Sequence, residues 1–249
     1  MWQAIVDFIN EEEKDYILNT VYLFDTGGIW EKDRQLIAYF NDTQELEKFR
    51  ECLKNKKIFF KKVRENIKWN SIWHKFHKPI SIKPFFIIPA FYKGGIPRGY
   101  KKIVINPSFA FGTGSHATTK ICIKFLIKYM KKGMKILDLG TGTGILAIVA
   151  EKLGGDEVYA VDIDSLAIKE ATRNVKRNRC KRIIVTDKVE NKNSFFDLCV
   201  SNILLDELIK LKPFFVSILI KRGILVLSGI LEEQKVEIIN NFKDSFRIL

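Results

Sequence analysis

No apolar run in this sequence reaches the ~18 residues that a membrane-spanning helix needs. Cysteine is scarce too, and the four that occur are scattered without a CxxC pair: Cys52, Cys122, Cys180 and Cys199. Their spacing argues against a zinc site or a disulfide framework and predicts free thiols in a reducing compartment. The first residues, MWQAIVDFINEEEK, have neither the basic segment nor the cleavage site of a secretory signal. We therefore expect a soluble, cytoplasmic globular protein.

Acidic residues are almost missing from the middle of the chain. Residues 57–102 hold 12 Lys and Arg against one Asp or Glu, a net charge of +11. Residues 1–56 have a net charge of −5 and residues 103–249 a net charge of +7, within a total of +13. An acidic N-terminal segment joined to a basic middle segment indicates separate units with separate partners. A solvated, lysine-rich surface explains the basic middle equally well.

The front of the chain alternates strand and helix patterns. We predict strands at residues 3–8 and 35–40, with a helix at 11–23 and a glycine turn at 27–28 between them. A second helix is predicted from Thr43 to about residue 56, because apolar residues recur there at helical spacing. These elements predict a small α/β domain over residues 1–56.

The next segment, FFKKVRENIKWNSIWHKFHKP, is basic, aromatic and amphipathic, and Pro79 ends it. We interpret residues 57–78 as a linker helix between two domains. His74 and His77 lie three residues apart, but no third ligand accompanies them, so no metal site is expected.

From residue 79 to residue 249, helix and strand patterns alternate after two short strands at 86–89 and 102–105. Near-continuous apolar strands such as KILDL, EVYAV and GILVLS are typical of strands that are buried on both faces. The sequence therefore predicts an α/β fold with a doubly wound, mostly parallel, Rossmann-like sheet and helices on both sides.

Two glycine-rich loops, FGTGSHATT at 111–119 and LDLGTGTGILA at 137–147, flank one predicted helix of this domain. The second loop lacks the third glycine of a dinucleotide-binding fingerprint, since Ile145 stands there, and it lacks the GK[ST] of a phosphate loop. Gly140, Gly142 and Gly144 would let the backbone approach a ligand closely. Asp138, just before the turn, suits a cation or an amine better than a pyrophosphate.

Asp162 ends the next predicted strand, where an acid can accept hydrogen bonds from both hydroxyls of a ribose. A ribose and a cation without phosphates indicate S-adenosylmethionine as the ligand. A nucleotide-binding sheet of another kind stays open on these spacings alone.

The segments INPSFAFGTGSHATT, LDLGTGTGILAIVA, AVDIDSLAI, SNILLDELIKL and LVLSGILEEQ occur in this order over about residues 69–235. Together they resemble the ribosomal protein L-eleven methyltransferases, the PrmA family. The glycine turn alone marks the broad methyltransferase class, whereas FGTGSHATT together with SNIL narrows the resemblance to this family. The family has an N-terminal substrate-recognition domain, a linker helix and a seven-strand catalytic domain.

The resemblance implies S-adenosylmethionine as cofactor, with contacts from Thr119, Gly140, Asp162 and Asn202. To these we add Asp138 and Gly142 from the glycine turn itself. The first loop would lie over the methionine end of the cofactor and the second would hold its adenosine end.

The acceptor amine is expected among Phe111, His116 and Asn202, which would position it. A general-base role for His116 and a structural role in its loop both stay open. The expected substrate is a basic large-subunit ribosomal protein of the L-eleven type, modified on lysine side chains, on the N-terminal α-amine or on both. No membrane or stable nucleic-acid partner is expected, while a transient ribosome contact stays open.

The sequence departs from the family at two places. Thr141 stands where the family usually has cysteine, a change that we expect to be harmless. The family also adds a strand hairpin after the last helix, and the C-terminal segment of this sequence is too short for it. Either the sheet is one or two strands short, or the sequence is truncated.

Two other functions agree with parts of the sequence. Methylation of ribosomal RNA is the alternative that the basic middle segment favours, but SNIL stands where base amino methyltransferases typically have an NPPY-like tetrad. A non-catalytic binding protein on the same scaffold is disfavoured by intact Gly140, Asp162 and Asn202.

Overall fold

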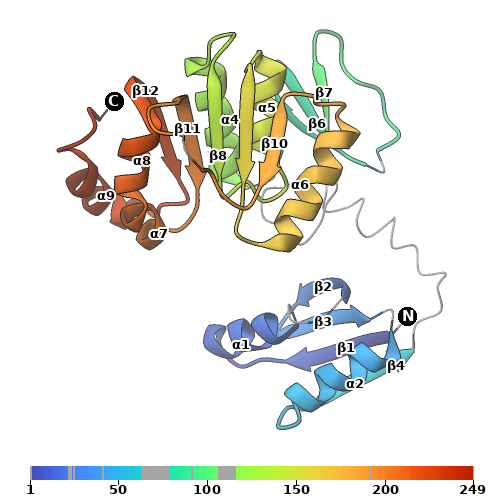
Figure 1. Cartoon of the computed structure of the whole chain (residues 1–249). Helices are drawn as coiled ribbons and strands as arrows, with labels where there is room; N and C mark the ends of the chain where they lie inside the picture. The colour runs from blue at the N-terminus through green and yellow to red at the C-terminus, as the bar shows by residue number, and fades with distance from the viewer. Residues whose placement is uncertain are drawn as a thin grey trace. The chain divides into compact units, whose positions relative to one another are not determined.

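The computed structural model describes residues 2–21, 24, 26–40, 42–62, 79–90, 92–105, 116–190 and 192–248. Its contacts divide the chain into an N-terminal unit, Met1–Ile72, and a C-terminal unit, Trp73–Leu249 (Figure 1). The expected linker helix over 57–78 falls outside the described residues from 63 onward, as do His74 and His77. No helix in the described ranges is long and apolar enough to cross a membrane.

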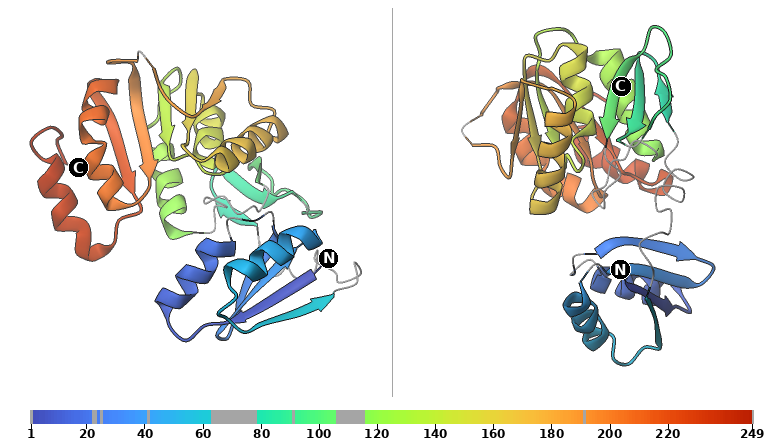
Figure 2. Two further views of the ribbon diagram at one scale, coloured as in Figure 1. Left: turned by 60° about the horizontal axis from the view of Figure 1, so that its bottom comes forward. Right: turned by 90° about the vertical axis from the view of Figure 1, so that its right-hand side faces the viewer.

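The N-terminal unit is an antiparallel sheet in the order β2-β3-β1-β4. Its elements are β1 (Trp2–Asp7), α1 (Glu11–Val21), β2 (Thr26–Lys32), β3 (Gln35–Phe40), α2 (Thr43–Cys52) and β4 (Ile58–Lys62). Figure 2 shows α1 and α2 on one face of the sheet, and there they bury Ile17 and Phe49 against Ala4, Val6 and Phe40. This unit therefore has a core of its own.

Two features of the N-terminal unit correct the sequence analysis. Residues 58–62 form β4, which pairs with β1 from Trp2↔Lys62 to Val6↔Ile58, so the expected linker helix does not begin at residue 57. The glycines at 27 and 28 lie inside β2 and not in a turn, with a register irregularity between Thr26 and Gly28.

The C-terminal unit contains a five-stranded parallel sheet in the order β10-β9-β8-β11-β12. Before it come β5 (Ile80–Ile82), β6 (Phe85–Pro89) and β7 (Lys101–Ile105), which form a separate three-stranded sheet. The remaining elements are α4 (Ala117–Tyr129), β8 (Lys135–Leu139), α5 (Ile145–Leu153), β9 (Glu157–Val161), α6 (Ser165–Arg177), β10 (Ile183–Thr186), β11 (Phe196–Asn202), α7 (Leu205–Lys210), α8 (Lys212–Ile218), β12 (Leu219–Ser228), a 3-10 turn (Glu232–Gln234) and α9 (Lys235–Phe242).

The predicted burial of the sheet on both faces is confirmed by its packing. On β8, Ile136 belongs to the core under α4 and α5, whereas the adjacent Leu137 belongs to the core under α7, α8 and α9. The α/β, doubly wound fold class is therefore confirmed. The main sheet has five strands in the part of the chain that the structure describes, against the seven that the resemblance implied.

Candidate functional site

Several of the predicted site residues lie at the carboxyl edge of the parallel sheet. β9, β8 and β11 are neighbours there, and they end at Val161, Leu139 and Asn202. Ser201 donates from its hydroxyl to the carbonyl of Leu139 at 2.9 Å, which ties the ends of β11 and β8 together. Asp162 and Gly140 directly follow their strands, so both lie at the same edge as Asn202.

The glycine turn has a backbone that residues with a Cβ rarely adopt. Gly140, Gly142 and Gly144 have φ values of 76°, 55° and 80°. The amides of Gly140 and Thr141 both donate to the carbonyl of Val161, at 2.8 and 2.9 Å, so the turn is fixed to the end of β9. Gly144 begins α5, and a Cβ there would lie 3.2 Å from the Cβ of Ala171 on α6. A side chain at this position would therefore crowd the packing of α5 against α6.

Asp162 is half-buried and holds the two loops at this edge. Its Oδ2 accepts the amide of Gly142 at 2.8 Å, and its Oδ1 accepts the amide of Asp164 at 3.0 Å. Each carboxylate oxygen has a second lone pair, so the group can still accept hydrogen bonds from two vicinal hydroxyls.

Asp138 is fully buried beneath the glycine turn. Its Oδ2 accepts from the Thr141 hydroxyl at 2.6 Å and from the Ala147 amide at 3.0 Å. Burial raises the pKa of this carboxyl to about 7, against the opposing effect of these two donors, and Asp162 raises it further. An added positive charge would favour the ionised form.

Four buried side-chain atoms have no hydrogen-bond partner among the described residues, and three of them belong to the predicted site. These three are Thr119 Oγ1, Asp138 Oδ1 and Asn202 Oδ1, which come from α4, β8 and β11. Buried polar atoms are usually paired, because an unpaired one costs about 1–3 kcal/mol. Unsatisfied oxygens around a carboxyl edge suit a ligand that brings hydrogen-bond donors and positive charge.

The structure gives His116 a local structural contact. His116 precedes α4 as its N-cap, and its Nδ1 lies 2.7 Å from the Thr118 hydroxyl and 3.4 Å from the Thr118 amide. Its proposed general-base role stays a prediction. Phe111, the third expected acceptor-site residue, lies outside the described residues.

Two residues at the site were not singled out for a role by the sequence analysis. A Cβ on Gly140 would lie 2.4 Å from Cγ2 of Ile203, and a Cβ on Gly229 would lie 2.4 Å from the Ile203 carbonyl oxygen. Both glycines therefore make room for Ile203, directly after Asn202. Thr141, expected to be a harmless replacement, is a donor to Asp138. Only the three-residue spacing from Asp138 to Thr141 hinted at that bond.

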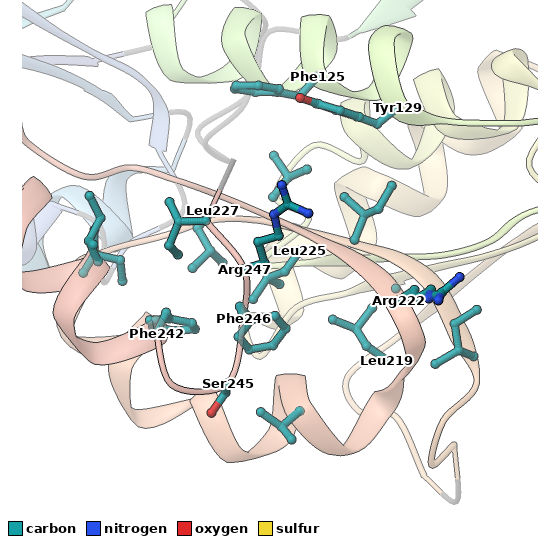
Figure 3. A pocket seen from close by; sticks show the side chains of 18 of the residues that line it. Phe125, Tyr129, Leu219, Arg222, Leu225, Leu227, Phe242, Ser245, Phe246 and Arg247 are labelled. Carbon is teal, nitrogen blue, oxygen red and sulfur yellow. The ribbon is translucent and has the colours of Figure 1, made fainter.

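A separate groove lies away from these residues, along β12 (Figure 3). Its volume is about 760 Å³, and its lining includes Phe125 and Tyr129 of α4 together with Phe242, Phe246 and residues of β12. None of the predicted site residues lines it. The groove is therefore distinct from the candidate site at the carboxyl edge.

Known proteins resemble this chain along nearly its whole length. A sequence model of the family described as ribosomal protein L11 methyltransferase (PrmA) matches residues 5–249. The ribosomal protein L11 methyltransferase of Dictyoglomus turgidum is 32% identical, over 99% of this chain and 89% of the relative. That of Caldicellulosiruptor saccharolyticus is 30% identical, over 98% of this chain and 93% of the relative.

A solved structure supports the same relationship. The crystal structure of the ribosomal protein L11 methylase from Lactobacillus delbrueckii subsp. bulgaricus is 30% identical and superimposes with a TM-score of 0.62. The match covers 67% of this chain and 88% of that chain. Together with the family match along residues 5–249, this shows that the chain belongs to the ribosomal protein L11 methyltransferase (PrmA) family of protein methyltransferases.

Proposed function

We propose that this protein transfers methyl groups from S-adenosylmethionine to amino groups of a large-subunit ribosomal protein of the L11 type. The observation that carries the proposal is the family match along residues 5–249, together with relatives whose names state that substrate. The alternative, methylation of ribosomal RNA, is not favoured because those relatives are named as protein methyltransferases.

The residues at the carboxyl edge fit the cofactor chemically. Asp162 would hold the ribose hydroxyls, and Gly140 and Gly142 would let the backbone lie against the ligand. Asp138 would lie near the positive charge of the cofactor. Thr119 and Asn202 supply acceptors that have no other partner among the described residues. When bound, S-adenosylmethionine supplies an electrophilic methyl group on a sulfonium.

The protein's own contribution is chiefly positioning, because methyl transfer is an in-line displacement. The acceptor amine must be neutral. A lysine with an ordinary pKa of about 10.4 is roughly 0.1% neutral near pH 7.4, which corresponds to about 4 kcal/mol. An α-amine with a pKa of about 7.7–8.0 costs less than about 1 kcal/mol. Desolvation would reduce the cost for lysine. We propose Asn202, His116 and Phe111 as the residues that position the amine.

Mass spectrometry of the purified ribosomal protein, after incubation with enzyme and cofactor, tests the proposal. We expect mass increments of one methyl group, on peptides that contain lysine or the N-terminus. Labelled methyl groups should appear on the protein and not on ribosomal RNA in a parallel reaction. Label on RNA alone would favour the alternative, and label on neither would remove the proposed activity.

Asp162→Ala provides a test of the cofactor site. Calorimetry should show a loss of cofactor affinity of a few kcal/mol, because two ribose hydroxyls lose their acceptor. Asp162→Asn is the matched control, since it keeps the side-chain shape and one acceptor oxygen and should retain part of the affinity. Unchanged affinity in the alanine variant would show that Asp162 does not bind the cofactor.

A further inference from the structure

The C-terminal unit has a strongly basic surface that the proposed site does not use. Residues 79–105, which contain β5, β6 and β7, hold four lysines and one arginine and no Asp or Glu. A second basic cluster, KRNRCKR at 176–182, lies at the end of α6. α6 begins near the carboxyl edge, three residues after Asp162, and residues 176–182 span its far end and lead into β10 (Figure 1). The cluster is thus at the opposite edge of the sheet from the candidate site.

Specific contacts join the two basic segments. The Asn178 side chain bonds both the amide and the carbonyl of Val104 on β7, at 2.8 and 2.6 Å. Lys152 donates to the Asn178 carbonyl at 3.4 Å, and Lys101 donates to the Lys152 carbonyl at 3.0 Å. The Lys101 amide in turn bonds the Pro84 carbonyl at 2.7 Å, next to Lys83.

Few carboxylates neutralise this surface. Arg182 pairs with Asp156 at 3.6 Å, and both side chains are largely exposed. The Glu151 carboxylate accepts the amides of Lys181 and Arg182 and so is occupied by backbone donors. Lys83, Arg179 and Lys181 are exposed and have no ion pair within the described part of the chain. The surface therefore keeps an excess of positive charge.

Aromatic rings lie on the β5–β6–β7 part of this surface. Phe86 on β6 contacts Tyr92 and Tyr100 with ring centroids 6.1 and 6.0 Å apart, and all three rings are partly exposed. Arg98 and Lys93 stand in the same loop. A cationic surface that carries accessible aromatic rings fits a polyanion with flat bases, because the bases stack while the phosphates pair with Lys and Arg. A phospholipid surface would not use the rings in this way.

We propose that the surface formed by the β5–β6–β7 sheet and residues 176–182, here called the basic face, binds single-stranded RNA through its phosphates and bases. Ribosomal RNA is the RNA that the proposed ribosomal-protein substrate would bring close. The RNA is a docking partner and not a methyl acceptor. The inference rests on the proposed function only for the source of the RNA, and its test requires no cofactor.

Fluorescence anisotropy with a labelled single-stranded RNA of about 20 nucleotides, somewhat longer than a usual single-strand site, measures this binding with the full chain. Three phosphate contacts should give a slope of about −2 in a plot of log affinity against log salt. The triple variant Lys83→Glu, Arg179→Glu and Lys181→Glu should bind roughly tenfold or more weakly and lose most of that slope.

A matched variant controls for net charge. Lys124→Glu, Lys221→Glu and Lys243→Glu change the charge by the same amount, on α4, on β12 and after α9. This control should keep nearly all RNA affinity, and circular dichroism melts of both variants should match the unmodified chain. An equal loss in both variants would show a net-charge effect and overturn the proposal. Stronger binding to phosphatidylglycerol vesicles than to RNA would assign the face to membranes and overturn it too.

Ultraviolet crosslinking of the unmodified chain to the same RNA, followed by mass spectrometry, needs no variant. We expect crosslinked peptides that contain Tyr92 or Tyr100. Crosslinks confined to the N-terminal unit would place the RNA elsewhere and overturn the proposal. Loss of methyl transfer with intact RNA binding would count against the proposed function alone.

Discussion

At the scale of single residues, Asp138 combines complete burial with a carboxyl oxygen that has no hydrogen-bond partner in the described part of the chain. The titratable groups that face it are Asp162 and the thiols of Cys122 and Cys199, and none of them is a cation. The neutral acid is therefore the favoured form in the free protein up to a pH of about 7.

This makes the stability of the free protein depend on pH. Because the folded-state pKa of Asp138 is raised from 3.8 to about 7, the folded protein binds more protons than the unfolded chain between these values. The contribution of Asp138 to the free energy of unfolding is fully present below pH 3.8 and is lost as pH rises to about 7. From pH 5 to pH 8 the loss is about 3 kcal/mol.

Asp138→Asn removes the titration and should flatten this dependence, as thermal melts of both proteins across the same pH range would show. Cofactor binding should also release a proton from Asp138 near pH 7, since positive charge favours the carboxylate. Calorimetry in two buffers of different ionisation enthalpy measures that proton. Identical pH profiles for the two proteins would mean that Asp138 is already ionised when buried.

Gly140 and Ile203 form a pair whose coupling can be measured. Gly140→Ala should destabilise the protein, since the left-handed backbone costs roughly 1–2 kcal/mol and the new Cβ would meet Ile203 at 2.4 Å. In an Ile203→Ala background only the backbone cost should remain. Urea unfolding of the four proteins gives the coupling energy, expected at about 0.5–3 kcal/mol. If Gly140→Ala destabilised the protein equally in both backgrounds, the contact between residue 140 and Ile203 would be contradicted.

At the scale of elements, Asn178 joins α6 to β7 through both backbone groups of Val104. Asn178→Ala leaves those two groups without their partner, so the free energy of unfolding should fall by roughly 1–3 kcal/mol. Asn178→Asp is the matched control, because it can still accept from the amide but cannot donate to the carbonyl. Hydrogen exchange should report faster exchange at the Val104 amide in the alanine variant and not in the aspartate variant.

The elements that the sequence predicted well are the strands buried on both faces, such as β8 and β9, whose apolar runs leave few alternatives. β2 was missed because two adjacent glycines are typical of a turn, and only pairing with β3 stabilises them as a strand. β4 was missed because its lysines suit an amphipathic helix equally well. Local pattern cannot decide such cases, since the deciding contacts are distant in sequence.

The site shows the same limit. The spacing of the glycine turn to Asp162 was enough to bring Gly142 and Asp162 into one prediction, and the structure joins them by a hydrogen bond. The role of Ile203 could not be predicted, because it depends on two glycines that lie 63 positions before it and 26 after it.

At the scale of the whole molecule, residues 1–56 of the N-terminal unit have a net charge of −5, which suits a basic protein substrate. Charge complementarity acts mainly on association rates, so methylation by the full chain should slow as salt rises. Because β4 belongs to this unit, a deletion that tests its role must remove residues 1–72 and not only 1–56. The C-terminal unit keeps its own cores after that deletion.

The shortened chain should retain cofactor affinity in calorimetry while losing methyl transfer to the ribosomal protein. The matched control is the full chain with uncharged residues in place of Glu45, Glu47 and Glu51 on α2. Its methylation rate should lose only the dependence on salt. Equal methylation by the shortened and full chains would make the N-terminal unit dispensable for substrate recognition.

The separate core of the N-terminal unit has a consequence for the protein's own synthesis. β1 leaves the ribosome first, yet its two sheet neighbours are β3 and β4, and β4 is made last. The nascent chain can therefore pair β1 with β3 early but must expose the other edge of β1 until residue 62 has emerged. From then on the unit can fold while the C-terminal unit is still being translated.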